Sequence, residues 1–172
     1  KRGDTKTFAS SMLMVQGSKG LGEGVINLKG MFSLDPLMGK SGYPLLFQTG
    51  ETADGETHLV DRQHPHNFFV ELGSSYAKPI TDKHSLFLYA GIVGEPALGP
   101  AVYMHRLSGN LNPEAPITHH WFDSTHITNG VLTLGLTHPL YKIEASLFHG
   151  REPSQNRYRI ELGQLDSYSA RF

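Results

Sequence analysis

The feature of this sequence that most limits its fold is an alternation of apolar and polar residues with a period of two. In residues 24–34, for example, Ile26 and Leu28 alternate with Asn27 and Lys29. Such a period places successive side chains on opposite faces of an extended strand. Gly and Pro recur every few residues, 19 and 10 times among 172, which leaves few windows for an α-helix. We therefore predict an all-β protein.

The alternation predicts about eight strands, most of them near ten residues long. They cover residues 7–16, 24–34, 67–77, 85–93, 126–137, 141–149, 157–163 and 167–172. Short connections are expected at residues 17–24 and 137–140, and long polar ones at residues 35–44, 50–65 and 107–121. Long strands joined alternately by short and long connections are typical of an outer-membrane barrel. The predicted fold is an antiparallel up-and-down β-barrel, or part of one, with long His-, Pro- and Gly-rich loops.

The same alternation also occurs in a soluble β-sandwich or barrel, so the pattern alone leaves both folds open. No apolar run approaches the 18 residues of a membrane-spanning helix, whereas a membrane-spanning β-strand needs only about 9–11 residues. In an outer-membrane barrel, Ile26, Leu28, Leu132 and Leu134 face lipid and their polar neighbours face inward. In a soluble fold these side chains form the core. The direction of the leucine side chains distinguishes the two.

Composition and motifs exclude several functions. The 15 basic and 16 acidic residues give a net charge of -1, so we expect no nucleic-acid partner. The absence of Cys excludes disulfides, thiolate nucleophiles, iron–sulfur clusters and cysteine-zinc sites. The chain has no Gly-x-Ser-x-Gly, phosphate-binding glycine loop or His-Glu-x-x-His motif. A non-enzymatic role is favoured, and a hydrolase using Glu95 and His105, or Asp123 and His126, is the weaker alternative.

Histidines gather in two of the long loops. The candidate metal ligands are Asp61, His64 and His66 in one cluster and His119, His120, Asp123 and His126 in the other. His64 and His66 share a face of an extended chain, and Pro65 stiffens it. Imidazole nitrogen together with carboxylate oxygen suits copper, nickel or zinc. We predict a transition-metal site, favoured if both loops lie at the same end of the sheet; alternatively, the histidines only order the loops.

A third unusual segment, residues 94–100, reads Gly-Glu-Pro-Ala-Leu-Gly-Pro. Its two prolines and two glycines fix a kinked path around Glu95. The segment either presents Glu95 near His105 or ends a strand with Glu95 paired to Arg106 or another cation. The second interpretation is favoured.

Several loop motifs resemble a known family. They are YPLLFQTGE (43–51), DRQHPH (61–66), GEPALGP (94–100), MHR (104–106), NPEAP (112–116), HHW (119–121), DSTHI (123–127) and GREP (150–153). Together they resemble a family of Gram-negative outer-membrane β-barrel proteins that is loosely associated with the handling of copper and other metals. The resemblance covers about residues 30–172.

The resemblance implies residence in the bacterial outer membrane, with the lipid bilayer as partner, and a channel, transport or structural role. Family members continue past Phe172 with more strands, so residues 1–172 are expected to form a single β-barrel domain that is a portion of a longer barrel. The family supplies no catalytic residues, so the metal candidates rest on their chemistry. The competing hypothesis is a soluble periplasmic β-domain that binds metal through the same histidines.

Overall fold

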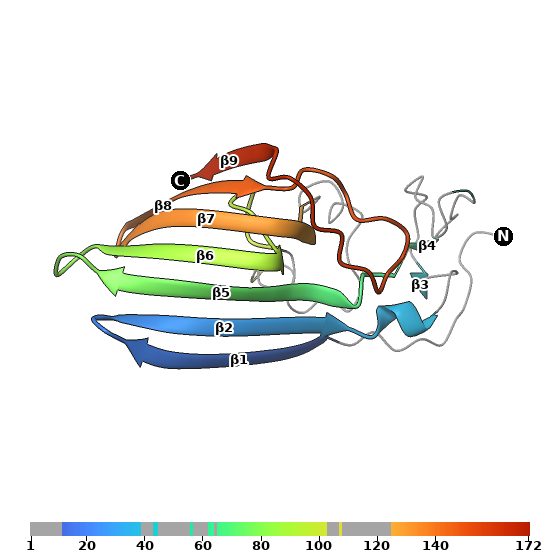
Figure 1. The fold of residues 1–172 in the computed structure, drawn as a ribbon, viewed down its shortest axis with the longest axis horizontal. Coiled ribbons are helices and arrows are strands. Elements are labelled where there is room, and N and C mark those ends of the chain that lie inside the picture. The colour runs from blue at the N-terminus through green and yellow to red at the C-terminus, as the bar shows by residue number, and fades with distance from the viewer. Residues whose placement is uncertain are drawn as a thin grey trace.

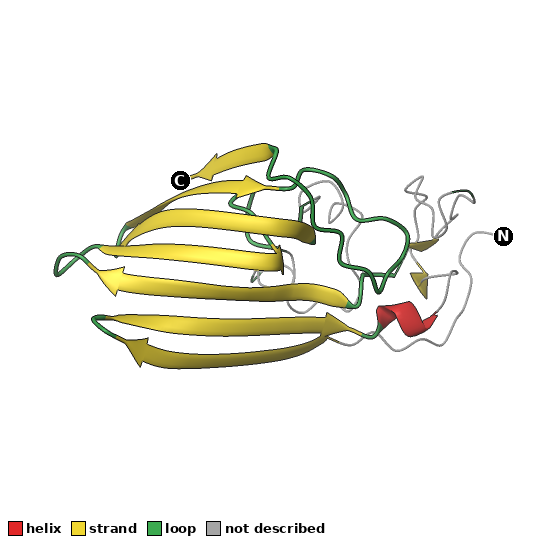
Figure 2. Ribbon diagram, viewed as in Figure 1, coloured by secondary structure: helices red, strands yellow, loops and turns green. Residues whose placement is uncertain are grey.

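The computed structural model describes residues 12–38, 43–44, 56, 62–63, 65–102, 107 and 125–172. Its main element is a seven-stranded antiparallel sheet with the order β1-β2-β5-β6-β7-β8-β9 (Figures 1 and 2). The strands are β1 (Met12–Leu21), β2 (Gly24–Ser33), β5 (Phe69–Pro79), β6 (Ser85–Gly94), β7 (Thr128–His138), β8 (Tyr141–Phe148) and β9 (Ser167–Arg171). Strands β3 (Tyr43–Pro44) and β4 (Arg62–Gln63) form a second, two-stranded sheet, and η1 (Asp35–Met38) is a short 3-10 helix. The all-β prediction is confirmed.

The seven strands run up and down in chain order. Short turns join β1 to β2, β5 to β6 and β7 to β8 at one end of the sheet, on the left of Figure 1, and the strand ends that the long connections join lie at the other end. Within the described residues, β1 and β9 each pair on one side only, so the sheet is not closed. This arrangement agrees with the predicted up-and-down part of a barrel. None of the described helices has the length and apolar character needed to cross a membrane.

The first hairpin differs from its prediction. Residues 17–24 were expected to form the connection, but β1 continues to Leu21 and only Gly22 and Glu23 form the turn, with Leu21 paired to Gly24. Gly22 has a φ of 58°, the left-handed conformation that a two-residue hairpin turn uses. Pairing with β2 therefore keeps Gly17 and Gly20 in a strand, although glycine has a low intrinsic preference for strands.

The predicted strand at residues 157–163 is wrong. This segment is a loop, in which the Ser154 backbone N–H and hydroxyl donate to the Glu161 carboxylate at 3.0 and 2.9 Å. The backbone N–H of Phe68 also donates to the Arg157 carbonyl at 2.7 Å. These contacts tie the loop to itself and to the start of β5, and it pairs with no strand.

The pairing register separates the sheet into two faces, because directly paired residues of antiparallel strands share a face. The apolar face contains Leu13, Val15, Ile26, Leu28, Leu72, Leu86, Leu88, Leu132, Leu134, Leu136, Ile143 and Leu147. The polar face contains Asn27, Lys29, Glu71, Ser75, Thr133, Thr137, Lys142, Glu144, Ser146 and Arg171. Leu134 is 53% exposed, whereas its neighbour Thr133 is 3% exposed.

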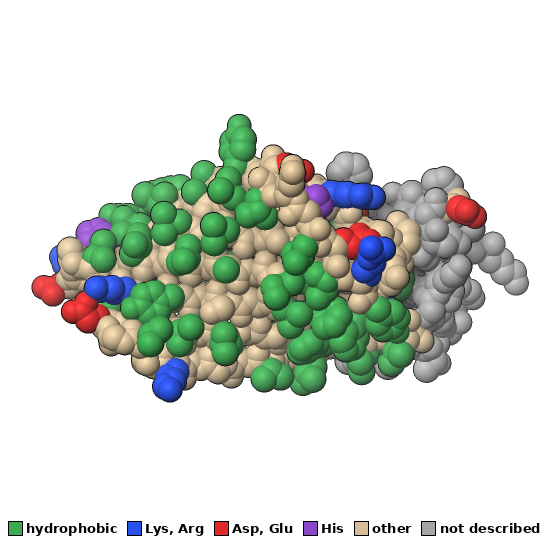
Figure 3. Space-filling model, viewed as in Figure 1, with side chains coloured by type: hydrophobic (Ala, Val, Ile, Leu, Met, Phe, Trp, Pro, Cys, Tyr) green, Lys and Arg blue, Asp and Glu red, His purple; other side chains and the backbone are tan. Residues whose placement is uncertain are grey.

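The packed side of the sheet is therefore the polar one. Figure 3 shows hydrophobic side chains spread over the strands of one face, with charged side chains gathered toward the two ends. The hydrophobic core of the described residues is small. Its central cluster consists of Met31, Val70, Val93 and Ile127, with Phe69 among the side chains packed against it. The other buried hydrophobic side chains are Ala97, Val102, Val131 and Phe148. Most leucines of the sheet point away from this core.

The turn conformation of Gly22 leads to a first prediction. We expect Gly22→Ala to lower the free energy of unfolding by about 1 kcal/mol, because a Cβ is disfavoured at positive φ. Gly20→Ala is the matched control, since a Cβ at either position meets no atom within 4 Å but only Gly22 has a positive φ. A denaturant titration of both variants measures the difference. Equal effects would contradict the argument.

Candidate functional site

The main candidate site is a polar cavity of about 290 Å³ on the polar face. Its lining residues are Lys29, Glu71, Ser75, Phe87, Tyr89, Glu95, Ala97, Thr133, Lys142, Glu144 and Arg171. Three of them are basic and three are acidic, so charges of both signs face the same space. The sequence predicts polar side chains on this side of the strands, and the structure brings them together around one cavity.

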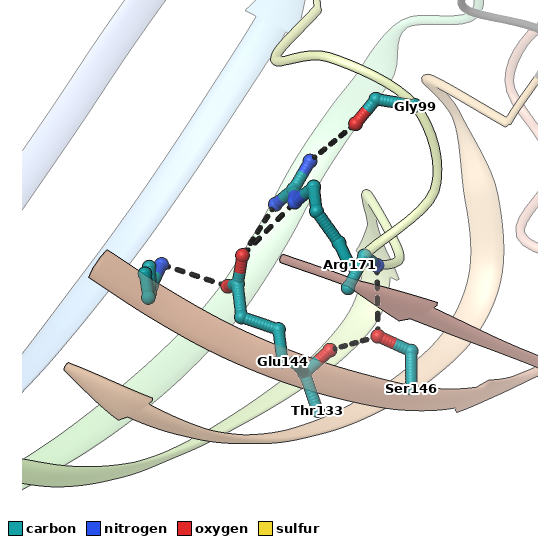
Figure 4. Close-up of polar contacts among 7 residues, drawn as sticks. Gly99, Thr133, Glu144, Ser146 and Arg171 are labelled. Carbon is teal, nitrogen blue, oxygen red and sulfur yellow. Dashed lines mark hydrogen bonds and ion pairs between the residues drawn. The ribbon is translucent and has the colours of Figure 1, made fainter.

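Glu144 is the centre of the charge network in the cavity wall. Its side chain is 8% exposed, and one carboxylate oxygen lies 2.9 Å from both Nε and Nη2 of Arg171 on the neighbouring strand β9 (Figure 4). Lys142 Nζ lies 2.7 Å from the other carboxylate oxygen. A buried carboxylate is costly unless it is paired and hydrogen-bonded. Two cations supply that compensation here.

Residues 94–102, which we call the inward loop, close the cavity on one side. The loop leaves β6 and crosses the polar face, where the backbone N–H of Ala97 donates to Ser146 Oγ at 2.8 Å. Arg171 Nη1 donates to the carbonyl oxygen of Gly99 at 3.0 Å (Figure 4). Ser146 Oγ also shares a 2.7 Å hydrogen bond with Thr133 Oγ1. The loop is therefore attached to the sheet through side chains of β8 and β9.

Tyr89 and Glu71 form another wall of the cavity. Tyr89 Oη donates to one Glu71 carboxylate oxygen at 3.2 Å, and Lys29 Nζ lies 2.7 Å from the other. A Cβ added at Gly94 would overlap Tyr89 Oη, so the glycine lets the loop begin beside this ring without displacing it. Glu95 follows directly and lines the cavity.

The two expected neighbours of Glu95, His105 and Arg106, lie outside the described residues. The prediction that Glu95 approaches one of them therefore stays a prediction. What the structure adds is the direction of this segment, because Glu95 shares the cavity with Lys29 and Arg171.

The histidine clusters meet through one residue from each. His66 is 4% exposed, its Nδ1 lies 2.8 Å from Asp35 Oδ2, and its ring is nearly perpendicular to that of His126, with centroids 5.4 Å apart. The other candidates, Asp61, His64, His119, His120 and Asp123, lie outside the described residues. Asp35 was not predicted, because it precedes His66 by 31 residues and no local spacing connects them.

Within the part of the chain that the structure describes, no group of three or more His, Asp or Glu side chains is arranged to hold a metal ion. The imidazoles of His66 and His126, together with the Asp35 carboxylate bonded to His66, form at most part of a metal-ligand set. This set lies at the end of the sheet where η1 precedes the long connection to β5.

Carboxylates also order the connection between β8 and β9. The backbone N–H of Ser154, followed by its hydroxyl, holds the pKa of Glu161 below its usual range. The backbone N–H of Gly150 does the same for the pKa of Asp166. Both carboxylates are therefore charged at neutral pH and act as acceptors that shape this loop.

Comparison of the chain with protein-family models, curated proteins and solved structures gave no match. The chemistry of the chain itself allows two activities. A cavity lined by paired charges can accommodate or pass hydrophilic solutes, and two adjacent imidazoles can contribute to a transition-metal site.

Proposed function

We propose that the chain is part of an outer-membrane β-barrel with a channel, transport or structural role, in which the apolar face contacts lipid and the polar face lines a hydrophilic lumen. The observation that carries the proposal is the direction of the side chains. Leu88, Leu134 and Leu147 are 46%, 53% and 50% exposed, whereas Thr133 and Ser146 are each 3% exposed. In water, a contiguous apolar surface of this kind is unfavourable, and lipid removes that cost.

Strand length supports the same proposal. Strands β1, β2, β5, β6 and β7 contain 10 or 11 residues, and β8 contains 8. A tilted membrane-spanning strand needs about 9–11 residues. Short turns at one end and long connections at the other are also typical of outer-membrane barrels.

Aromatic rings at both margins of the sheet give further support. At the turn end, Tyr141 stacks on His138 with ring centroids 4.6 Å apart, and Phe172 lies 6.3 Å from Tyr141. At the opposite end, the rings of Phe32 and Phe68 lie 5.7 Å apart. Outer-membrane barrels carry aromatic girdles at both membrane interfaces, on either side of the apolar band.

Extraction and gel mobility test the proposal. We expect the full-length protein to leave membranes only with detergent, and to migrate faster on a gel when it is not heated, because a folded barrel resists the detergent. A protein that is folded and soluble without detergent would overturn the proposal. That result would favour the alternative of a periplasmic β-domain.

A second proposed activity is transition-metal binding, copper included, at the His66–His126 pair. The specific observation in its favour is the meeting of two histidines from separate clusters, with a carboxylate on one ring. A carboxylate bonded to one nitrogen of a metal-ligating imidazole fixes the ring and raises the basicity of the other nitrogen. Asp35 is in position to act on His66 in this way. These residues are only part of a ligand set, so the proposed site also needs ligands from the rest of the two predicted histidine clusters.

Calorimetric titration of the full-length protein with Cu²⁺ or Zn²⁺ tests the site. We expect Asp35→Asn to weaken binding by about 10- to 100-fold, and the double change His66→Ala/His126→Ala to abolish it. His84→Ala is the control, because His84 lies at the turn end of the sheet and bonds Thr81 and Tyr141. Unheated gel mobility checks that each variant is folded. Unchanged stoichiometry and affinity in the double variant would remove both histidines from the site.

A further inference from the structure

The inward loop, residues 94–102, takes an unusual path for a connection between two strands. Figure 1 shows this yellow-green segment leaving the end of β6 and passing behind the sheet, and its hydrogen bonds to Ser146 and Arg171 place it on the polar face. Pro96, Ala97 and Val102 are buried there. The segment therefore fills part of the space that the proposed lumen would occupy.

The local sequence gives the loop a defined shape. The backbone N–H of Leu98 donates to the carbonyl oxygen of Pro96 at 2.7 Å, which forms a tight turn. Gly99 follows with a φ of 66°, a conformation that favours glycine. Two prolines in the segment, Pro96 and Pro100, restrict the backbone further. The loop is thus an ordered element with a fixed position.

Two side-chain hydrogen bonds attach the loop to strands β8 and β9. Ser146 accepts from Ala97 and is itself bonded to Thr133, while Arg171 donates to Gly99 and is itself paired with Glu144. The strand ladders of β7, β8 and β9 do not include the loop. These two hydrogen bonds can therefore be removed without unpairing the sheet.

We propose that the inward loop is the constriction of the lumen, and that its hydrogen bonds to Ser146 and Arg171 set how far it closes the passage to small hydrophilic solutes. This inference rests on the proposed outer-membrane barrel. The cavity of about 290 Å³ between the loop and the strands is then the narrow zone, and Lys29, Glu95 and Lys142 supply charges of both signs along it. Charged side chains at a constriction determine which solutes pass.

A reversible crosslink tests the proposal. The Ala97 nitrogen lies 2.8 Å from Ser146 Oγ, and the chain has no cysteine, so Ala97→Cys/Ser146→Cys introduces one defined pair. In the reduced form the Ser146 hydrogen bond is lost, whereas in the oxidised form a covalent bond replaces it. We expect single-channel conductance of the full-length protein in planar bilayers to rise on reduction and to return to the unmodified value on oxidation.

Two further variants keep the test independent of disulfide formation. Ser146→Ala and Arg171→Lys each remove a contact to the loop, and we expect both to raise conductance. The control pair Ser18→Cys/Asn27→Cys joins directly paired residues of β1 and β2, away from the loop, and should give no redox-dependent change.

The outcomes separate the inference from the function on which it rests. Equal conductance for the unmodified protein and all loop variants, in protein that has inserted into the bilayer, would overturn the constriction and leave the barrel. Inserted protein without any conductance in every variant would also overturn it. A protein that does not insert into bilayers would overturn the proposed barrel itself.

Discussion

Leu134→Arg is expected to make folding into a bilayer less favourable by about 2–4 kcal/mol, the cost of arginine near the membrane midplane on the lipid face of a barrel. Leu134 lies in β7 on the apolar face and is 53% exposed. Thr137→Arg is the matched control in the same strand, because Thr137 lies on the polar face, paired with Lys142, and is exposed. We expect this control to fold into the bilayer nearly as well as the unmodified protein.

Denaturant titrations of folding into lipid vesicles measure both variants, and unheated gel mobility reports the folded fraction. A soluble β-domain predicts a different result, because substitutions at exposed positions in water usually change stability by less than about 0.5 kcal/mol. Two arginine variants with the same small effect would therefore contradict the membrane assignment of the apolar face.

Glu144→Gln is expected to destabilise the folded protein by about 2 kcal/mol, because Arg171 and Lys142 lose a charged acceptor that is largely buried. The loss falls below that of a fully buried pair, since the Arg171 and Lys142 side chains are 29% and 48% exposed. Glu23→Gln is the matched control, because Glu23 pairs with Lys78 on the surface, where ion pairs contribute little.

The same titrations compare the two glutamate variants, and the double variant Glu144→Gln/Arg171→Gln measures how strongly the pair is coupled. We expect the double variant to lose less stability than the sum of its single variants. Equal effects of Glu144→Gln and Glu23→Gln would show that the Glu144 network does not stabilise the sheet.

Sequence patterns predict the strands of this fold well where alternation and turn chemistry agree. Strand β7 alternates leucine with threonine and glycine, and β8 alternates apolar residues with lysine, glutamate and serine. The turn at Pro139 and Leu140 falls within the predicted connection. These sequence patterns fail where pairing with a neighbouring strand decides whether a segment becomes a strand. Glycines near Gly20 suggested a loop but lie in β1 because β2 supplies the ladder, whereas residues 157–163 alternate without a partner strand and remain a loop.

The candidate site, like the strands, could be predicted only in part from the sequence. The polar face was predictable as a face, since a period of two assigns it residue by residue. The contacts on this face were not predictable. Glu144 and Arg171 are 27 residues apart in the sequence, and they meet only because of the register in which β8 pairs with β9. The inward loop was recognisable as kinked, but no sequence pattern indicates that Ala97 bonds to Ser146.

Because the hydrophobic core is small, the stability of this sheet depends on what surrounds it. Eight hydrophobic side chains are buried among the described residues, four of them in the cluster of Met31, Val70, Val93 and Ile127, while the leucines of the strands lie on the other face. In the proposed membrane setting, the lipid that covers that face would supply most of the hydrophobic stabilisation. In the proposed membrane setting, the acyl-chain length of the lipid or detergent would then shift the unfolding transition with no change in sequence. In that setting, the fold would be encoded jointly by the chain and by the thickness of the layer around it.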